Sequence, residues 1–174
     1  TKLICGDIKN KDIYNSIIAE SIDMDVDFIL ATPPCQGMST IGKLDLLDKR
    51  NQLISYAINI IKKIKPKYVL LENIPQQLRT SIIINNFKIL IPEYIKKSLE
   101  KDYFIEDSVI NVADYGVPQI RKRSLFLMTR KDLRKKFTFL EKNEFMNHIN
   151  LSESIGDLPS LDPQVQEFSP EKQL

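Results

Sequence analysis

Hydrophobic and polar residues alternate along the chain in blocks that predict a regular succession of strands and helices. Short apolar runs, each bounded by polar or turn-forming residues, predict strands over residues 3–5, 25–31, 68–72, 103–112 and 124–128. Apolar residues at helical spacing predict helices over residues 12–21, 50–64 and 87–101. Pro66 ends the second helix, whereas Pro92 lies inside the third and indicates a kink or a break.

The order of these elements predicts an α/β fold. Strands that alternate with helices form βαβ units, and such units build a mainly parallel sheet. A length of 174 residues is enough for one domain with its own core. After Thr129 the chain becomes more polar, and residues 151–174 are predicted to be an irregular connector with little core.

Composition narrows the class of protein only slightly. Apolar residues make up 43% of the chain and charged residues 28%, as in an ordinary globular protein, and no apolar run reaches the roughly 18 residues of a membrane helix. Two cysteines do not make a disulfide framework in a chain of this length, which favours a reducing cytosolic compartment. The single histidine argues against a Cys–His hydrolase and, with scattered cysteines, against a zinc site.

Local charge says more about partners than the net charge of +2. Basic residues cluster at residues 62–65, 121–123 and 130–136, and each cluster could meet phosphate groups. For the first and third clusters, solvated helix ends and loops explain the charges equally well.

A thiol follows the predicted strand over residues 25–31. Pro33 and Pro34 stiffen the backbone just before Cys35, because each proline ring fixes φ, and Gly37 allows a sharp turn or the close approach of a ligand. Glu72 ends the next predicted strand, and the carboxyl ends of parallel strands meet at one edge of a sheet. Cys35 and Glu72 are therefore predicted to share a cleft, although a lone cysteine can equally be a small buried hydrophobic residue.

Several short segments resemble the motifs of one family and occur in that family's order. They are Gly6-Asp7-Ile8, Pro34-Cys35-Gln36, Asp48-Lys49-Arg50-Asn51, Glu72-Asn73-Ile74, the residues Gln119, Arg121 and Arg123 preceded by residues 114–118, and Ile155-Gly156-Asp157-Leu158-Pro159. With these motifs, the chain resembles a cytosine-C5 DNA methyltransferase of the bacterial restriction-modification type. The resemblance extends over residues 2–160.

The resemblance implies a Rossmann-like methyltransferase sheet, mostly parallel with helices on both faces, of which this chain holds only the central part. Residues 1–140 would be a partial catalytic domain that depends on S-adenosylmethionine, and residues 141–174 a connector towards the target-recognition region. The sequence has no Gly-x-Gly and so lacks the family's opening cofactor loop, and it lacks the target-recognition domain. We therefore expect the chain alone to bind S-adenosylmethionine weakly or not at all.

The resemblance also implies the roles of individual residues. Cys35 would add to C6 of a cytosine, and Glu72 would neutralise the charge that develops at N3. Arg123 would donate to the ring carbonyl O2, with Arg121 beside Cys35 and a phosphate. By this resemblance, the cofactor S-adenosyl-L-methionine would be bound by Asp7, Ile8 and Pro33. The substrate would be double-stranded DNA, from which the base must be flipped. The residues that would contact this DNA are Gln36, Ser39, Arg50 and Asn73.

Two other functions stay open at this point. Without the cofactor loop, the chain could be a catalytically inactive remnant that binds only nucleic acid or a partner. A relative that methylates cytosine in tRNA is the other alternative. If the protein is an enzyme, we expect the active species to be the parent protein, or a complex with a complementing subunit, in the bacterial cytoplasm.

Overall fold

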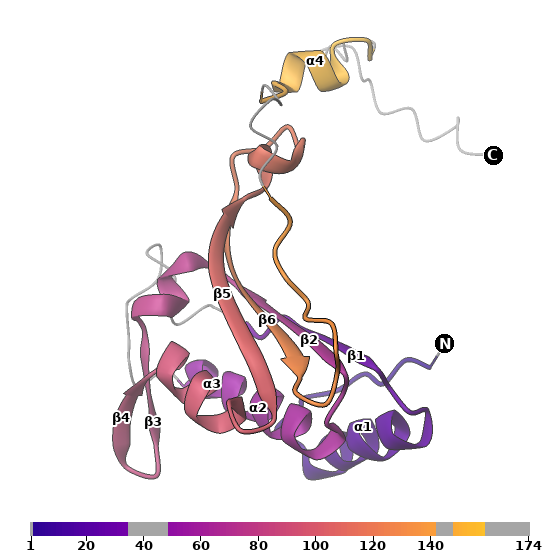
Figure 1. Cartoon of the computed structure of the whole chain (residues 1–174), viewed down its shortest axis with the longest axis vertical. Helices are drawn as coiled ribbons and strands as arrows, with labels where there is room; N and C mark the ends of the chain where they lie inside the picture. The colour runs from indigo at the N-terminus through magenta and orange to yellow at the C-terminus, as the bar shows by residue number, and fades with distance from the viewer. Residues whose placement is uncertain (1, 35–48, 142–147, 159–174) are drawn as a thin grey trace, which may run out of the picture.

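The computed structural model describes residues 2–34, 49–141 and 148–158. A four-stranded sheet with the order β1-β2-β6-β5 forms the centre, and β3 and β4 form a separate two-stranded sheet (Figure 1). The strands are β1 (Phe28–Ala31), β2 (Tyr68–Asn73), β3 (Ser81–Ile84), β4 (Phe87–Leu90), β5 (Tyr103–Asn111) and β6 (Lys122–Arg130). The helices are α1 (Lys11–Asp23), α2 (Leu53–Ile64), α3 (Ile91–Leu99) and α4 (Leu151–Ile155), with short 3₁₀ helices η1 (Lys49–Gln52), η2 (Pro75–Arg79) and η3 (Val112–Tyr115).

The central sheet is mixed, which corrects the prediction of a mostly parallel sheet. β1 and β2 run parallel, whereas β6 runs antiparallel to both β2 and β5. The connection between β5 and β6 holds only the short helix η3. A parallel return needs a crossover of about a dozen residues or more, usually with a helix, so the chain turns back antiparallel.

Most of the predicted strands are confirmed. The predictions over residues 68–72, 103–112 and 124–128 correspond to β2, β5 and β6, and the second half of the prediction over residues 25–31 corresponds to β1. Residues 3–5 form no strand, and Leu3 is 90% exposed. A strand needs backbone partners, and within the described ranges β1 pairs only with β2.

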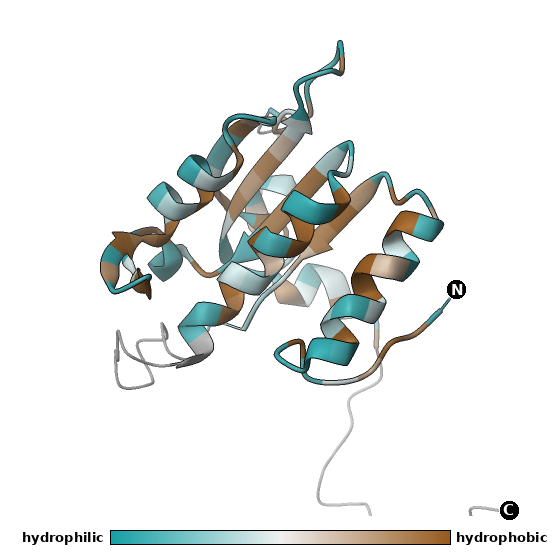
Figure 2. Ribbon diagram, turned by 90° about the horizontal axis from the view of Figure 1, so that it is seen from below, coloured by the Kyte–Doolittle hydropathy of each residue, from teal (hydrophilic) through white to brown (hydrophobic). Residues whose placement is uncertain are grey.

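Helices α1, α2 and α3 lie side by side on one face of the central sheet (Figures 1 and 2), which confirms the predicted helices over residues 12–21 and 50–64. The left-handed cap residue Lys65 and Pro66 end α2 where the sequence predicted. Between these helices and the sheet lies a core of Ile54, Ile58, Ile61, Val69, Leu71, Ile82, Ile91, Ile95, Leu99, Tyr103, Phe126 and Met128. No helix in the described ranges is long and apolar enough to cross a membrane.

The other face of the sheet carries no helix in the described part of the chain. Phe137, from the segment after β6, packs edge-on against Phe28 of β1 and Tyr68 of β2, with ring centroids 6.5 and 6.0 Å away. This cover is partial, since Phe28 and Leu30 remain 46% and 58% exposed. β1 therefore presents apolar side chains to its surroundings.

The region predicted as one helix over residues 87–101 begins as the second strand of a hairpin. β3 and β4 pair antiparallel around Asn85 and Asn86, whose φ angles of 49° and 66° suit a tight hairpin turn. α3 starts at Ile91, so Pro92 lies in the first helical turn, where its missing N–H leaves no hydrogen bond unmade. Pro92 thus marks the start of a helix and not a kink.

Candidate active site

The ends of three strands meet at one edge of the central sheet, which we call the site edge. Glu72 and Asn73 close β2, and they pair in register with Leu125 and Ser124 of β6. β1 ends beside them, because Ala31 pairs with Leu71. The segment after β1, the end of β2 and the start of β6 therefore share this edge.

Glu72 and Arg123 form an ion pair at the site edge. The distance between Glu72 Oε1 and Arg123 Nε is 2.6 Å, and the two side chains are 29% and 19% exposed. Arg123 also donates through Nη1 to the backbone carbonyl of Lys122, at 2.8 Å, which fixes the plane of its guanidinium. The two motifs named in the sequence thus meet as an acid and a cation within hydrogen-bond distance.

Asn73 follows Glu72 in β2 and holds the segment that leads to Cys35. Its amide nitrogen donates to the carbonyl of Pro33 at 3.0 Å, and its amide oxygen accepts from the backbone N–H of Ile74 at 2.8 Å. The residue is only 3% exposed. Its side chain is therefore buried, with both ends of its amide engaged within the protein, and its predicted DNA contact stays a prediction.

Three of the predicted site residues lie outside the described residues, namely Cys35, Gln36 and Ser39. Arg50 lies in η1, but its side chain is not among those described. The distance from the Cys35 sulfur to the Glu72 carboxyl group therefore stays a prediction. The described anchor closest to it in sequence is Pro34, which follows the Pro33 carbonyl held by Asn73.

Arg121 enters the site edge from the turn between β5 and β6. Its backbone N–H donates to Asn111 Oδ1 at 3.0 Å, and its carbonyl accepts from the N–H of Val112 at 3.0 Å. Gly116 allows the turn, because its φ of 84° belongs to the left-handed region. The Arg121 side chain is exposed, so it is available to a ligand at this edge.

A second polar contact lies near the ion pair, and no sequence pattern predicted it. Gln77 in η2 donates from Nε2 to Ser124 Oγ at 3.3 Å, and Ser124 Oγ lies 3.5 Å from the carbonyl of Ile74. Both residues are 0% exposed. These two residues lie 47 positions apart, so no local pattern could have paired them.

A cavity of about 630 Å³ lies at the end of β1, between α1 and α2. Asp7, Ile8 and Pro33, the residues assigned to the cofactor, all line it. Gly6 approaches α1 closely, since a Cβ there would lie 2.9 Å from the side chain of Ile13. Glycine at this position therefore lets the Asp7 segment lie against the helix.

The lining of this cavity would fit only part of S-adenosylmethionine. Its walls are mostly apolar, which suits a flat ring such as adenine. Asp7 is the only charged residue among the described lining residues. A hydrogen bond from the backbone N–H of Lys9, at 2.9 Å, and the Lys9 ammonium group, at 3.2 Å, lower the pKa of Asp7. The described lining offers no second carboxylate for the ribose hydroxyls.

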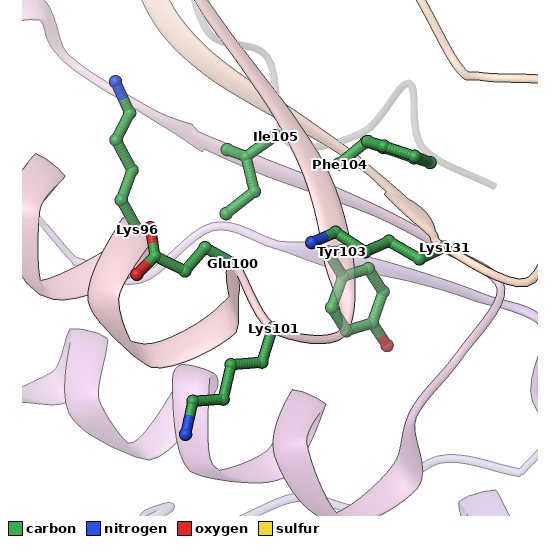
Figure 3. Close-up of a pocket in the computed structure, with 7 residues that line it drawn as sticks. All are labelled: Lys96, Glu100, Lys101, Tyr103, Phe104, Ile105 and Lys131. Atoms are coloured by element: carbon green, nitrogen blue, oxygen red, sulfur yellow. The ribbon is translucent and has the colours of Figure 1, made fainter.

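A different hollow, of about 570 Å³, lies near the opposite edge of the sheet, along α3 and the start of β5 (Figure 3). Lys96, from α3, pairs there with Asp107 at 2.7 Å. Lys131 and Lys136 lie over the ring of Phe104, at 5.7 and 4.3 Å from its centroid. The third basic cluster thus makes contacts within the chain itself, which favours the structural explanation of its charges over a phosphate site.

Comparisons with known proteins establish the family of the chain. The family model of the C-5 cytosine-specific DNA methylases matches residues 1–173, and the chain belongs to this family. The chain is 37% identical over 166 residues to the type II methyltransferase M1.HgaI of Avibacterium volantium, a match that covers 92% of this chain and 45% of that protein. It is 34% identical over 161 residues to the type II methyltransferase M.NgoPII of Neisseria gonorrhoeae, covering 91% and 44%.

A solved structure shows the same arrangement of elements. It is the crystal structure of a protein described as a DNA modification methyltransferase encoded within an E. coli prophage, with a TM-score of 0.66 and 25% identity over 90% of this chain and 42% of that one. The predicted Rossmann-like class is therefore confirmed. The chain spans less than half the length of these relatives, and methyltransferases of this family use S-adenosylmethionine.

Proposed function

We propose that the protein containing this chain transfers a methyl group from S-adenosylmethionine to C5 of cytosine in double-stranded DNA. The Glu72–Arg123 ion pair, with its 2.6 Å separation at the site edge, is the observation that carries the proposal. It lies beside the Asn73 contact that holds Pro33, two residues before Cys35. An acid, a cation and a nearby thiol are the groups that addition to a pyrimidine ring requires.

The reaction begins with a cytosine flipped out of the duplex, because C6 is out of reach inside the base stack. The Cys35 thiolate forms a bond to C6, and the electron pair of the C5–C6 double bond moves into the ring towards C5 and N3. Arg123 exchanges its contact with Glu72 for the ring carbonyl O2. Glu72 is then free to carry a proton to N3, which keeps the ring neutral while C5 becomes nucleophilic. Once C5 has taken the methyl group, it would lose its proton to solvent and the C5–C6 double bond would re-form as the Cys35 thiolate leaves. N3 would then return its proton to Glu72.

Bound S-adenosylmethionine would supply the methyl group on a sulfonium. Ile8 and Pro33 would contact its adenine ring, and Asp7 would accept from it. Because the described cavity holds no second carboxylate, we expect weak binding or none by this chain alone. The missing contacts would come from the rest of its own chain or from a complementing subunit. A micromolar affinity of the isolated chain in calorimetry would contradict this expectation.

Four residues would contact the DNA around the flipped base. Gln36 would occupy the gap in the duplex or contact the orphan guanine, and Ser39 and Arg50 would hold phosphates. Arg121 would hold a further phosphate next to Cys35, which its exposed side chain at the site edge supports. We assign this activity to the bacterial cytoplasm.

Covalent trapping tests the proposal. The full-length protein is incubated with S-adenosylmethionine and a duplex that contains 5-fluorocytosine, and in parallel with tRNA that contains it. Fluorine at C5 cannot leave as a proton, so the bond between sulfur and C6 should persist. We expect an adduct with the duplex that disappears in Cys35→Ser. An adduct with tRNA alone would reassign the substrate, and no adduct with either would point to an inactive binding remnant.

A further inference from the structure

We infer that Gln77 and Ser124 act as a brace that positions the Glu72–Arg123 pair for the reaction, an inference that rests on the proposed function. Gln77 Nε2 donates to Ser124 Oγ at 3.3 Å, and Ser124 Oγ in turn lies 3.5 Å from the carbonyl oxygen of Ile74. The brace therefore ties η2 and the end of β2 to the start of β6.

The brace lies next to both members of the ion pair. Ser124 directly follows Arg123 in β6, and it pairs in register with Asn73, which directly follows Glu72 in β2. A shift of β6 relative to β2 at this position would move the carboxylate and the guanidinium apart. A misplacement of reacting groups by about 1 Å can lower the rate about a hundredfold, so a small shift of β6 here would slow the reaction.

The composition of the brace is not the most stable arrangement for a buried site. Gln77 is 0% exposed, and its Oε1 has no hydrogen-bond partner among the described residues. A buried acceptor without a partner destabilises the folded state, whereas an apolar side chain of similar shape carries no such penalty. The Gln77 amide therefore lowers the stability of the fold, and we explain its presence by the hydrogen bond with which it positions the site edge.

Two variants of the full-length protein test the brace. Gln77→Met keeps the size of the side chain and removes the hydrogen bond, and Ser124→Ala removes the hydroxyl. For both we expect kcat to fall about tenfold while KM for the duplex stays within about twofold, because positioning acts on the transition state more than on binding. The thermal midpoint of Gln77→Met should stay unchanged or rise. The double variant should lose no more than the larger single loss, because both changes remove one contact.

Tyr103→Phe is the matched control. It also removes one buried hydrogen bond, from the Tyr103 hydroxyl to the carbonyl of Pro66 at 2.8 Å, but at the opposite edge of the sheet. This variant should lose stability and keep its kcat. The brace would be overturned if Gln77→Met and Ser124→Ala behaved like this control, or if both failed to fold.

The assay separates the brace from the proposed function. If the wild-type protein traps 5-fluorocytosine DNA and the two variants trap it at the wild-type rate, the brace is wrong and the methyltransferase function stands. If the wild-type protein traps no substrate, both are overturned.

Discussion

The two edges of the central sheet use the same kinds of side chain for different purposes. At the site edge, Glu72 and Arg123 are mostly buried and depend on each other. At the opposite edge, Arg130 pairs with Asp132 at 2.7 Å, and Lys67 pairs with exposed Asp27 at 2.9 Å. Exposed pairs keep water as an alternative partner and contribute little each, whereas a mostly buried pair needs a replacement partner if it opens.

Uncharged groups at the opposite edge also have their partners within the chain. The Tyr103 hydroxyl donates to the Pro66 carbonyl at 2.8 Å and is buried beneath it. A charged group nearby is also paired, since the ammonium group of Lys65, from the first basic cluster, lies 3.9 Å from Asp102. In contrast, Gln77 at the site edge keeps an unpaired acceptor among the described residues. The opposite edge is thus organised for stability, whereas we propose that the site edge is organised for contact with a ligand.

The strongest test of this contrast is Glu72→Gln. The amide keeps the shape of the side chain but cannot pass a proton to N3, so the rate of adduct formation should fall by about 10²- to 10⁴-fold. The thermal midpoint should also fall, because the amide leaves the guanidinium of Arg123 without its carboxylate partner. Glu100→Gln, in the hollow near the opposite edge of the sheet, is the control and should leave the rate of adduct formation unchanged. An unaltered rate in Glu72→Gln would remove this carboxyl group from the chemistry.

Asn73→Ala should affect both rate and stability. It leaves the half-buried Pro33 carbonyl without its donor and the Ile74 N–H without its acceptor, which costs about 1–3 kcal/mol in unfolding free energy. The loosened segment before Cys35 should also slow adduct formation about tenfold or more. Urea denaturation and the trapping assay measure the two effects.

Thr129→Val is the control for Asn73→Ala. It removes the acceptor for the N–H of Phe137, a 2.6 Å contact at the opposite edge, and should reduce stability alone. If Thr129→Val slowed trapping as much as Asn73→Ala, the contrast between the edges would fail.

Tyr103 should give the opposite edge a dependence on alkaline pH. Burial raises the pKa of Tyr103 from 10.0 to about 12. The unfolded chain loses this proton first, so the stabilising contribution is complete below pH 10 and is lost as the pH rises towards 12. Thermal unfolding at stepped alkaline pH should show this fall, and Tyr103→Phe should weaken it. An identical fall in that variant would assign the effect to other groups.

Asp132→Asn should have the smallest effect. The hydrogen bond from Arg130 lowers the pKa of Asp132 below its usual 3.8. The ionised form is therefore favoured in the folded state, and its contribution is present above pH 3.8 and lost as the pH falls through the lower folded value. Thermal midpoints of the wild type and Asp132→Asn should converge in acid, with no change in the trapping rate at neutral pH.

The sequence predicted the elements whose signal is local. The apolar run over β2 and the helical spacing along α2 were sufficient, and the family motifs named both Glu72 and Arg123 before their contact was known. The direction of β6 was not predicted, because it follows from the length of its connection to β5 and not from the apolar pattern of the strand. The hairpin was missed because Phe87 and Leu90 continue the helical spacing of Ile91, Tyr94 and Ile95.

The remaining site features depend on contacts between distant parts of the chain. Asn73 was predicted to touch DNA because it follows Glu72 in a motif, but its burial against Pro33 depends on the pairing of β1 with β2. Gln77 had no local signal, since a glutamine in a polar turn is normally exposed. Its partner Ser124 came within reach only when β6 paired with β2.

The uncovered side of β1 has a practical consequence for work with this chain in isolation. Its outer backbone groups have no strand partner within the described ranges, and Phe28 and Leu30 stand out from the same strand. An exposed edge with apolar side chains is a template for pairing with another molecule. Purified by itself, the 174-residue chain should self-associate with rising concentration, and light scattering would record this.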